Sequence, residues 1–343
     1  MANRKRNIVL FSLLFVCLLL LLLINISFGS VHIPFRDVFE SLTGEEASKS
    51  TWEYIIMNYR LPKAITAILV GMGLSVSGLL MQTLFRNPLA GPDVLGLSSG
   101  ASLSVAIVIL GAGLLPSFLN TLVLSSYGLV LASTFGSFVV LIAVLLVSQK
   151  LRDTMAILII GLMFSSFTNS FVNILTYFSS AEQLQKFTFW SLGNLGNLSW
   201  TAIIQLSVCV MTGLFLSFLC IKSLNALLLG ENYARSLGIN FKKTRLIILI
   251  ATSILTGSIT AYAGPIAFIG LAIPHIAKLL FQTSNHNILY WSTLLVGAAV
   301  MLICDVVSQM PGMEVTLPIN AITSLIGAPV VVWLLVRKRK MMN

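Results

Sequence analysis

The chain has 343 residues, of which 57% are hydrophobic and 9% are charged, and its formal net charge is +10. This composition excludes a soluble globular protein and predicts an all-α protein that crosses the membrane several times. The four cysteines lie singly inside apolar runs, so neither a disulfide framework nor a cysteine metal site is indicated.

Apolar runs without charges follow one another along the chain, and each can hold a membrane-spanning helix of ~20 residues. The first run is about twice as long as the core of a signal peptide and lacks a small-residue cleavage pattern, so we expect an uncleaved span. One membrane domain, residues 1–343, is therefore predicted to contain about ten spans, near residues 8–28, 64–85, 94–110, 124–147, 154–178, 200–221, 246–263, 266–282, 288–308 and 317–336.

Basic residues indicate the orientation of the spans. With both termini in the cytoplasm, the inner segments hold sixteen of the 21 Lys and Arg residues. The outer segments hold Arg36, Lys49, Arg60, Lys63 and Lys186. This bias follows the positive-inside rule and predicts a multi-pass protein of a bacterial cytoplasmic membrane. Attraction to the anionic inner leaflet explains the net charge, so membrane lipid is an expected partner and nucleic acid is not.

Two of the outer cations lie where the second span begins. Arg60 and Lys63 are three residues apart, so they would share one face of the helix, and Pro62 suits its first turn. The two cations could bind an acidic partner at the outer surface. Basic residues also anchor many helix ends by snorkelling, and spacing alone favours that interpretation.

Two segments rich in Gly and Pro interrupt the helix pattern. Residues 86–96 are expected at the inner face and residues 264–275 at the outer face. Interrupted segments at related places in two halves suggest a weak inverted repeat around a central pathway, which Gly264 and Pro265 would line. The alternative is that Gly and Pro are simply common in membrane helices.

Polar residues gather on one side of the fifth predicted span. Asn169 and Asn173 are four residues apart, with Thr168 and Thr176 beside them. Amides and hydroxyls at such positions could line a translocation pathway. They could equally bridge neighbouring helices through hydrogen bonds.

The loop at residues 222–245 carries five basic residues and a short predicted helix between two spans. Glu231 suits the first turn of that helix, Arg235 follows four residues later, and Gly238 ends it. About two helical turns cannot cross a hydrocarbon core of ~30 Å. We therefore expect this helix at the cytoplasmic surface, where it offers a docking site for another protein.

Asp305 is the one acidic residue predicted deep in a span. A carboxylate there could bind a proton or a cation for ion-coupled transport. It lies near the outer end of the ninth span, where no basic residue is expected at the same depth, so we favour a hydrogen bond to a neighbouring helix. His32, His275 and His286 lack metal-ligand spacing, and no metal site is predicted. A G-x-x-x-x-G-K-[ST] phosphate loop and a catalytic constellation are also absent from the sequence, so we expect neither ATP binding nor enzyme activity.

Several segments resemble, in order along the chain, the permeases of type II ATP-binding-cassette (ABC) importers for ferric siderophores, haem and cobalamin. These segments are Tyr59–Lys63, Val70–Gly78, Arg86–Ala90, Leu95–Ala101, Gly264–Gly270 with Pro274 and His275, Gly297 and Ala298 with Asp305, and Leu325–Pro329. The coupling-helix loop of that family is similar to Leu229, Gly230, Glu231, Ala234, Arg235, Leu237 and Gly238.

The resemblance implies ten spans per subunit, two permease subunits, two cytoplasmic ATP-binding subunits and an extracytoplasmic binding protein. It implies that the coupling loop inserts into the ATPase and transmits its motion, and that Arg60 and Lys63 dock acidic residues of the binding protein. The chain itself would bind no cofactor, because ATP and magnesium belong to the ATPase partner.

The expected function is import of an iron(III)–siderophore complex by alternating access. Haem or cobalamin is the alternative cargo within the family. From other classes, an ion-coupled secondary transporter and a membrane receptor or scaffold remain as alternatives.

Two positions depart from the family's pattern. An Arg often follows the Asp of the ninth span, where this chain has Gln309, and the family's Glu-Leu-Pro-Val-Gly is replaced by residues Thr316–Asn320. One basic docking contact is therefore in doubt. We expect a heterodimer, in which a different second permease supplies what this chain lacks.

Overall fold

The computed structural model describes residues 2–29, 31–45, 47–93, 95–111, 124–150, 154–196, 198–310 and 316–340. The regular elements of these residues are all helical. They are α1 (Ala2–Ser27), α2 (Phe35–Thr43), α3 (Ser50–Ile55), the π-helical turn η1 (Ile56–Arg60), α4 (Leu61–Leu84), α5 (Leu97–Leu110), α7 (Ser126–Lys150), α8 (Thr154–Tyr177), α9 (Ala181–Ser191), α10 (Trp200–Leu219), α11 (Ile221–Leu228), α12 (Glu231–Ser236), α13 (Phe241–Ala263), α14 (Ile269–Phe281), α15 (His286–Ser308) and α16 (Ile319–Lys340).

Each predicted span contains one of these helices. Within the described residues, seven helical stretches are long and apolar enough to cross a membrane, and they correspond to α1, α3 to α4, α7, α8, α10, α13 and α15. The remaining predicted positions hold the shorter apolar helices α5, α14 and α16. The prediction of an all-α, multi-span membrane protein is confirmed.

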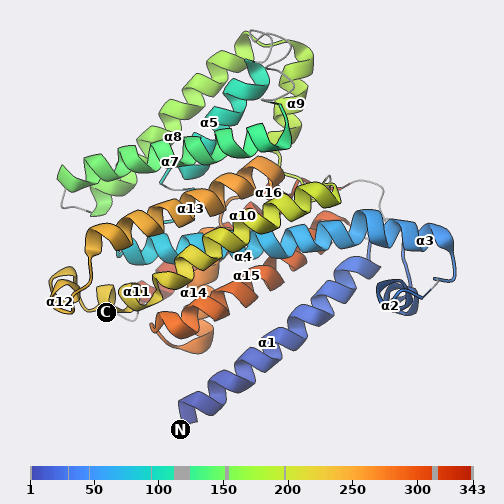
Figure 1. Cartoon of the computed structure of the whole chain (residues 1–343), viewed down its shortest axis with the longest axis horizontal. Helices are drawn as coiled ribbons and strands as arrows, with labels where there is room; N and C mark the ends of the chain where they lie inside the picture. The colour runs from blue at the N-terminus through green and yellow to red at the C-terminus, as the bar shows by residue number, and fades with distance from the viewer. Residues whose placement is uncertain are drawn as a thin grey trace.

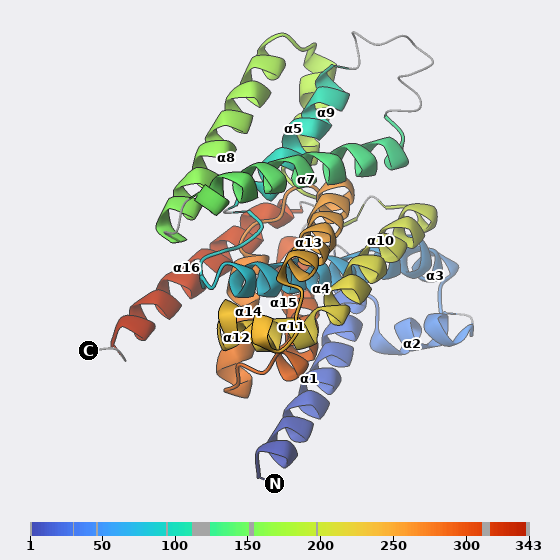
Figure 2. The same ribbon diagram turned by 60° about the vertical axis from the view of Figure 1, so that its left-hand side comes forward.

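The helix α4 lies at the centre of the molecule. Both views place α5, α7, α8 and α9 on one side of it and α1 on the opposite side (Figure 1, Figure 2). The helices α2 and α3 lie near one end of α4, and α11 and α12 lie near its other end (Figure 1). Following the predicted orientation, we call these the outer end and the inner end.

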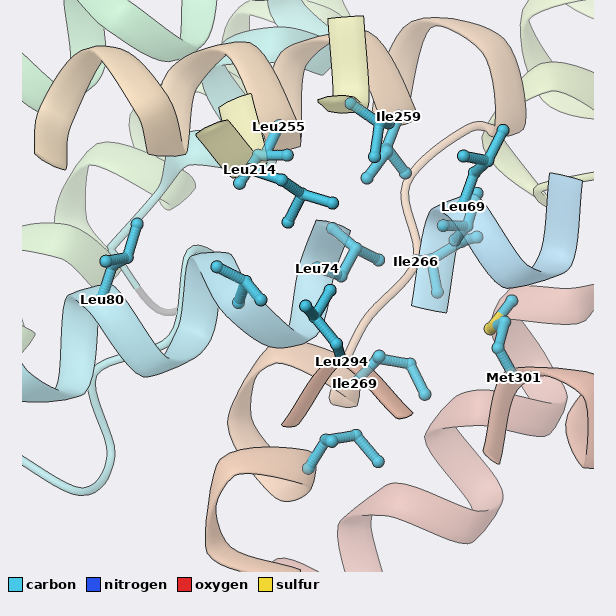
Figure 3. Close-up of a cluster of buried hydrophobic side chains, with 14 of the residues drawn as sticks. Leu69, Leu74, Leu80, Leu214, Leu255, Ile259, Ile266, Ile269, Leu294 and Met301 are labelled. Carbon is cyan, nitrogen blue, oxygen red and sulfur yellow. The ribbon is translucent and has the colours of Figure 1, made fainter. Parts of the chain in front are cut away.

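Apolar side chains from four helices surround the middle of α4. In a bilayer they gain mainly from close packing, because lipid is as apolar as the side chains themselves. Figure 3 shows part of this core, in which α4 meets α10, α13, α14 and α15 through Leu69, Leu74, Leu80, Leu214, Leu255, Ile259, Ile269, Leu294 and Met301.

Glycines let α4 approach two of its neighbours backbone to backbone. A Cβ atom at Gly71 would overlap the carbonyl of Gly297 on α15, and one at Gly78 would overlap the carbonyl of Gly270 on α14. Small residues at such crossings are a usual basis of helix association in membranes. The two crossings therefore fix how α15 and α14 lie against α4.

The two interrupted segments meet in the interior, so the prediction that they lie at opposite faces is wrong for their adjoining parts. The Nε2 atom of His275 is 2.8 Å from the carbonyl oxygen of Pro88, and the Gln82 side chain donates to the carbonyl oxygen of Leu271 at 3.0 Å. The cause is the short helix α14. It begins only at Ile269, beside the inner half of α4, so the chain before it runs inward without helical structure.

Four short helices were not predicted: α2, α3, α9 and α11. None of them has an apolar run long enough to span a membrane, so the pattern of apolar runs does not indicate them. For α9 a signal was present. Ser180 accepts from the backbone N–H of Gln183, whose side chain accepts from the Ser180 N–H, which is a capping box readable as S-x-x-Q.

The α4–α14 crossing can be tested with Gly78→Ala. An alanine in an exposed helix would stabilise by about 1 kcal/mol, whereas overlap with the Gly270 carbonyl should lower the free energy of unfolding by about 3 kcal/mol. Thermal unfolding in detergent measures the effect. Gly91→Ala is the matched control, because its Cβ would lie 3.5 Å from Leu271, an ordinary contact. Equal melting temperatures for the two variants would contradict the close crossing.

Candidate functional site

Arg60 turns its charge inward at the outer end. Its Nη1 atom donates to the carbonyl oxygens of Ile26 at 2.7 Å and Ser27 at 2.6 Å, and Nη2 donates to the carbonyl of Val31. The first two carbonyls end α1, where a helix leaves acceptors unpaired and its dipole is negative. Arg60 is 8% exposed, so it ties the end of α1 to η1 rather than standing free at the surface.

Lys63 and Asp305 form an ion pair, with 3.0 Å between Nζ and Oδ1. The expectation that no basic residue lies at the depth of Asp305 is therefore wrong. The reason is the register of α4 and α15, which cross at Gly71 and Gly297. Each charged residue lies eight positions from its glycine toward the outer end, which is about 12 Å along either helix. The antiparallel crossing thus brings the two side chains to one level.

Two amides complete the surroundings of the Asp305 carboxylate. Its Oδ2 atom accepts from the side-chain amides of Asn25 at 2.8 Å and Gln309 at 2.9 Å. A Cβ at Gly29 would lie 2.8 Å from Arg60 Nη2 and 3.2 Å from Gln309 Oε1. Gln309, which stands where the family often has an Arg, therefore donates a hydrogen bond to Asp305 and lies close to Arg60. We call Arg60, Lys63, Asp305, Asn25 and Gln309 the outer polar cluster.

A cavity of about 850 Å³ opens beside the outer polar cluster. Gly264 belongs to its wall, whereas Pro265, Asn169 and Asn173 do not. Among the described residues, no group of three or more His, Cys, Asp or Glu side chains could hold a metal ion. The residues that line the cavity include Tyr59, Arg60, Lys63, Trp190, Asn194, Gly264, Asp305 and Gln309.

Asn169 and Asn173 are exposed on α8 in the single chain. The nearby hydroxyls of Thr168 and Thr176 bond carbonyls of their own helix. The polar side of α8 is therefore exposed in the single chain. Its asparagines and Gly264 do not line the same cavity. The predicted pathway role of these residues stays a prediction.

Two short helices, α11 and α12, cover the inner end where one was predicted. Asn225 on α11 accepts from the backbone N–H of His286, the first residue of α15, at 2.8 Å. The Arg86 side chain, just after α4, donates to the carbonyl of Leu227 at 3.1 Å. The additional helix α11 is thus fixed to the inner ends of both α4 and α15.

Exposed apolar side chains lie on α12 and at both of its ends. Tyr233 is on α12 and is 52% exposed, whereas Leu229 precedes the turn at Gly230 and Leu237 follows Ser236, and they are 66% and 56% exposed. Ala234 of the same helix is fully buried. Exposed apolar residues gathered around a surface helix are typical of a protein contact. We call Leu229, Tyr233 and Leu237 the α12 stripe.

Glycines bound α12 at both ends. Gly230 has φ +116° and Gly238 has φ +78°, so both adopt backbone conformations that side chains disfavour. The predicted start of the helix at Glu231 and its stop at Gly238 agree with these turns. The interaction predicted between Glu231 and Arg235 concerns side chains outside the described part of the structure.

The ion pair predicts an asymmetric response to mutation. Lys63→Met leaves a buried carboxylate without its counter-charge and should lower the free energy of unfolding by about 3 kcal/mol. Adding Asp305→Asn removes that charge and keeps a hydrogen-bonding group beside Asn25 and Gln309. The double variant should therefore recover most of the loss in thermal unfolding. If the double variant were as unstable as Lys63→Met, the pairing would be unsupported.

Comparison with known proteins identifies the family. The FecCD transport family matches residues 17–337. The hemin transport system permease protein HmuU of Yersinia pestis is 32% identical over 341 residues, which cover 99% of both chains. The vitamin B12 import system permease protein BtuC of Klebsiella pneumoniae is 34% identical over 325 residues, which cover 94% of this chain and 92% of that protein.

A solved structure agrees with these relatives. It is described as an inward-facing conformation of a metal-chelate type ABC transporter, with a TM-score of 0.80 and 28% identity, and the match covers 96% of this chain and 99% of that one. Such a permease is not catalytic, and its ATPase and binding protein are separate partners. The chain belongs to the FecCD transport family and is a multi-pass permease subunit of an ABC importer in the cell membrane.

Proposed function

We propose that this permease imports an iron(III)–siderophore complex by alternating access, with energy from two separate ATP-binding subunits. The observation that carries the ATPase-driven mechanism is the α12 stripe, an exposed apolar contact surface held on a well-anchored base. Support for a metal chelate as cargo comes from the likeness to the metal-chelate transporter structure.

The packing of α12 and α11 against the long helices suggests how motion of the ATPase is transmitted to them. A partner bound to the α12 stripe would contact a helix that is packed against the permease on its other side, where Ala234 is fully buried. The neighbouring α11 is bonded to the inner ends of α4 and α15. Closure of the ATPase would therefore move these long helices as a unit rather than bend a loose loop.

The pathway is proposed to run between two permease subunits, beside α8. Ser166, Asn169, Ser170 and Asn173 recur at three- and four-residue spacing and are exposed. A second permease would cover this polar side, leaving a passage lined by amides and hydroxyls. Gly264 and Pro265 would contribute at the break before α14.

The second permease is proposed to be a different chain. Gln309 bonds Asp305, and it cannot supply the positive charge that the family often places at this position. Arg60 and Lys63 are proposed to bind acidic residues of the binding protein. In the free permease, Arg60 donates to backbone carbonyls and Lys63 pairs with Asp305. Tagged copies of this chain that purify with only one permease species would count against the heterodimer.

Haem is the second candidate cargo, because the relative from Yersinia pestis is a hemin permease. Vitamin B12 is a further candidate on the same grounds. Uptake in proteoliposomes that contain the permeases, the ATPase and the binding protein separates these cases, using ⁵⁵Fe-siderophores, haem and cobalamin in parallel. Siderophore uptake that needs ATP and stops with vanadate supports the proposal. Uptake that follows a proton or sodium gradient without ATP would instead indicate a secondary transporter.

The α12 stripe predicts the effect of Leu237→Asp. A carboxylate within an apolar contact has to be desolvated, so the affinity of the ATPase subunit should fall about tenfold or more, and uptake should fall with it. Leu42→Asp is the control, since Leu42 is an exposed leucine on α2 at the outer end. Pull-down of the ATPase at increasing concentrations measures both variants. Equal ATPase binding by the two would remove the stripe from the coupling surface.

A further inference from the structure

Among the residues that the structure describes, those lining the outer cavity carry one excess positive charge. Arg60, Lys63 and Asp305 are the charged residues among those that line it. Asp305 neutralises Lys63 at 3.0 Å, whereas Arg60 is held by backbone carbonyls, which carry no full charge. A cavity with this balance attracts an acidic group and repels a basic one.

The two members of the ion pair are held unequally. The Asp305 side chain is 1% exposed, and it keeps two amide donors, from Asn25 and Gln309, without Lys63. The Lys63 side chain is 17% exposed, and its stem runs along the cavity wall near Gly196. If the pair separates, Lys63 is therefore the group that moves, on a flexible four-carbon stem.

We propose that an acidic side chain of the binding protein enters this cavity and takes Lys63 away from Asp305. The inference rests on the proposed docking role of Arg60 and Lys63 and gives that docking a mechanism. Asp305 acts as an internal competitor for the docking acid, and Arg60 supplies the attraction that remains while Lys63 is still paired.

The exchange would have a consequence at the other end of the molecule. The ion pair joins α4 to α15 at their outer ends, and α11 joins the same two helices at their inner ends. Loss of the outer pair loosens one of these two connections. Docking would thus reach the coupling surface through α4 and α15.

Asp305→Asn tests the competition directly. The asparagine keeps a hydrogen-bonding group beside Asn25 and Gln309 but no longer holds Lys63, so the affinity for the purified binding protein should rise by about tenfold. Glu182→Gln is the matched control, because it removes one negative charge from the exposed Glu182–Lys186 pair, on α9 at the outer end. The measurement is the dissociation constant between the complete detergent-solubilised importer and the binding protein at low salt. A gain no larger than that of Glu182→Gln, or a loss, overturns the proposal.

A second variant covers the case in which Asp305→Asn alone does not fold. Lys63→Met combined with Asp305→Asn removes both charges and should bind several-fold more weakly than the wild type. Unchanged affinity in this double variant would also overturn the exchange, because a purely structural pair predicts that result. If the wild-type importer does not bind the binding protein at all, the docking role itself fails, which is a different outcome.

Discussion

Close backbone packing around α4 is the constraint on which the rest of the structure depends. Lipid offers little hydrophobic driving force between helices, so association relies on contact at short range. Gly71 and Gly297 supply it between α4 and α15, and Gly78 and Gly270 supply it between α4 and α14. The first crossing sets the register of the central helix pair. The second places the start of α14 in the interior, where the chain must run without helical structure.

The register of α4 and α15 decides which polar groups can meet. Lys63 reaches Asp305 at the outer end, and Thr83 reaches His286 across 2.8 Å at the inner end. A buried ion pair contributes little net stability, because desolvation of both charges offsets their attraction. The Lys63–Asp305 pair instead acts on the relative position of the two helices. It stabilises one register of two apolar helices, since a displaced register would leave a charge unpaired in the membrane.

The spans were predictable from the sequence because apolar runs and charge bias act locally, one helix at a time. The start of α12 at Glu231 and its stop at Gly238 were predictable for the same reason. The Lys63–Asp305 pair was not, since it depends on which helices cross and at which residue, and a single sequence carries no such register. The meeting of Pro88 with His275 depends on helix contacts in the same way. The roles proposed for Asn169 and Asn173 involve a second subunit, which the sequence of this chain does not describe.

The positions of the continuous helices and of the interruptions indicate where the backbone can bend when the permease changes conformation. Both α4 and α15 run unbroken between the two ends, so a push at α11 reaches the outer polar cluster without an intervening loop. The chain is interrupted instead around Arg86, after α4, and between Gly264 and Phe268, before α14. All three residues have positive φ, at +48°, +76° and +67°. Residues at the ends of helices absorb the backbone changes of hinge motions. In the alternating access proposed above, these interruptions would flex while α4 and α15 each move as continuous helices, which gives a role to the Gly and Pro residues that gather at the interruptions.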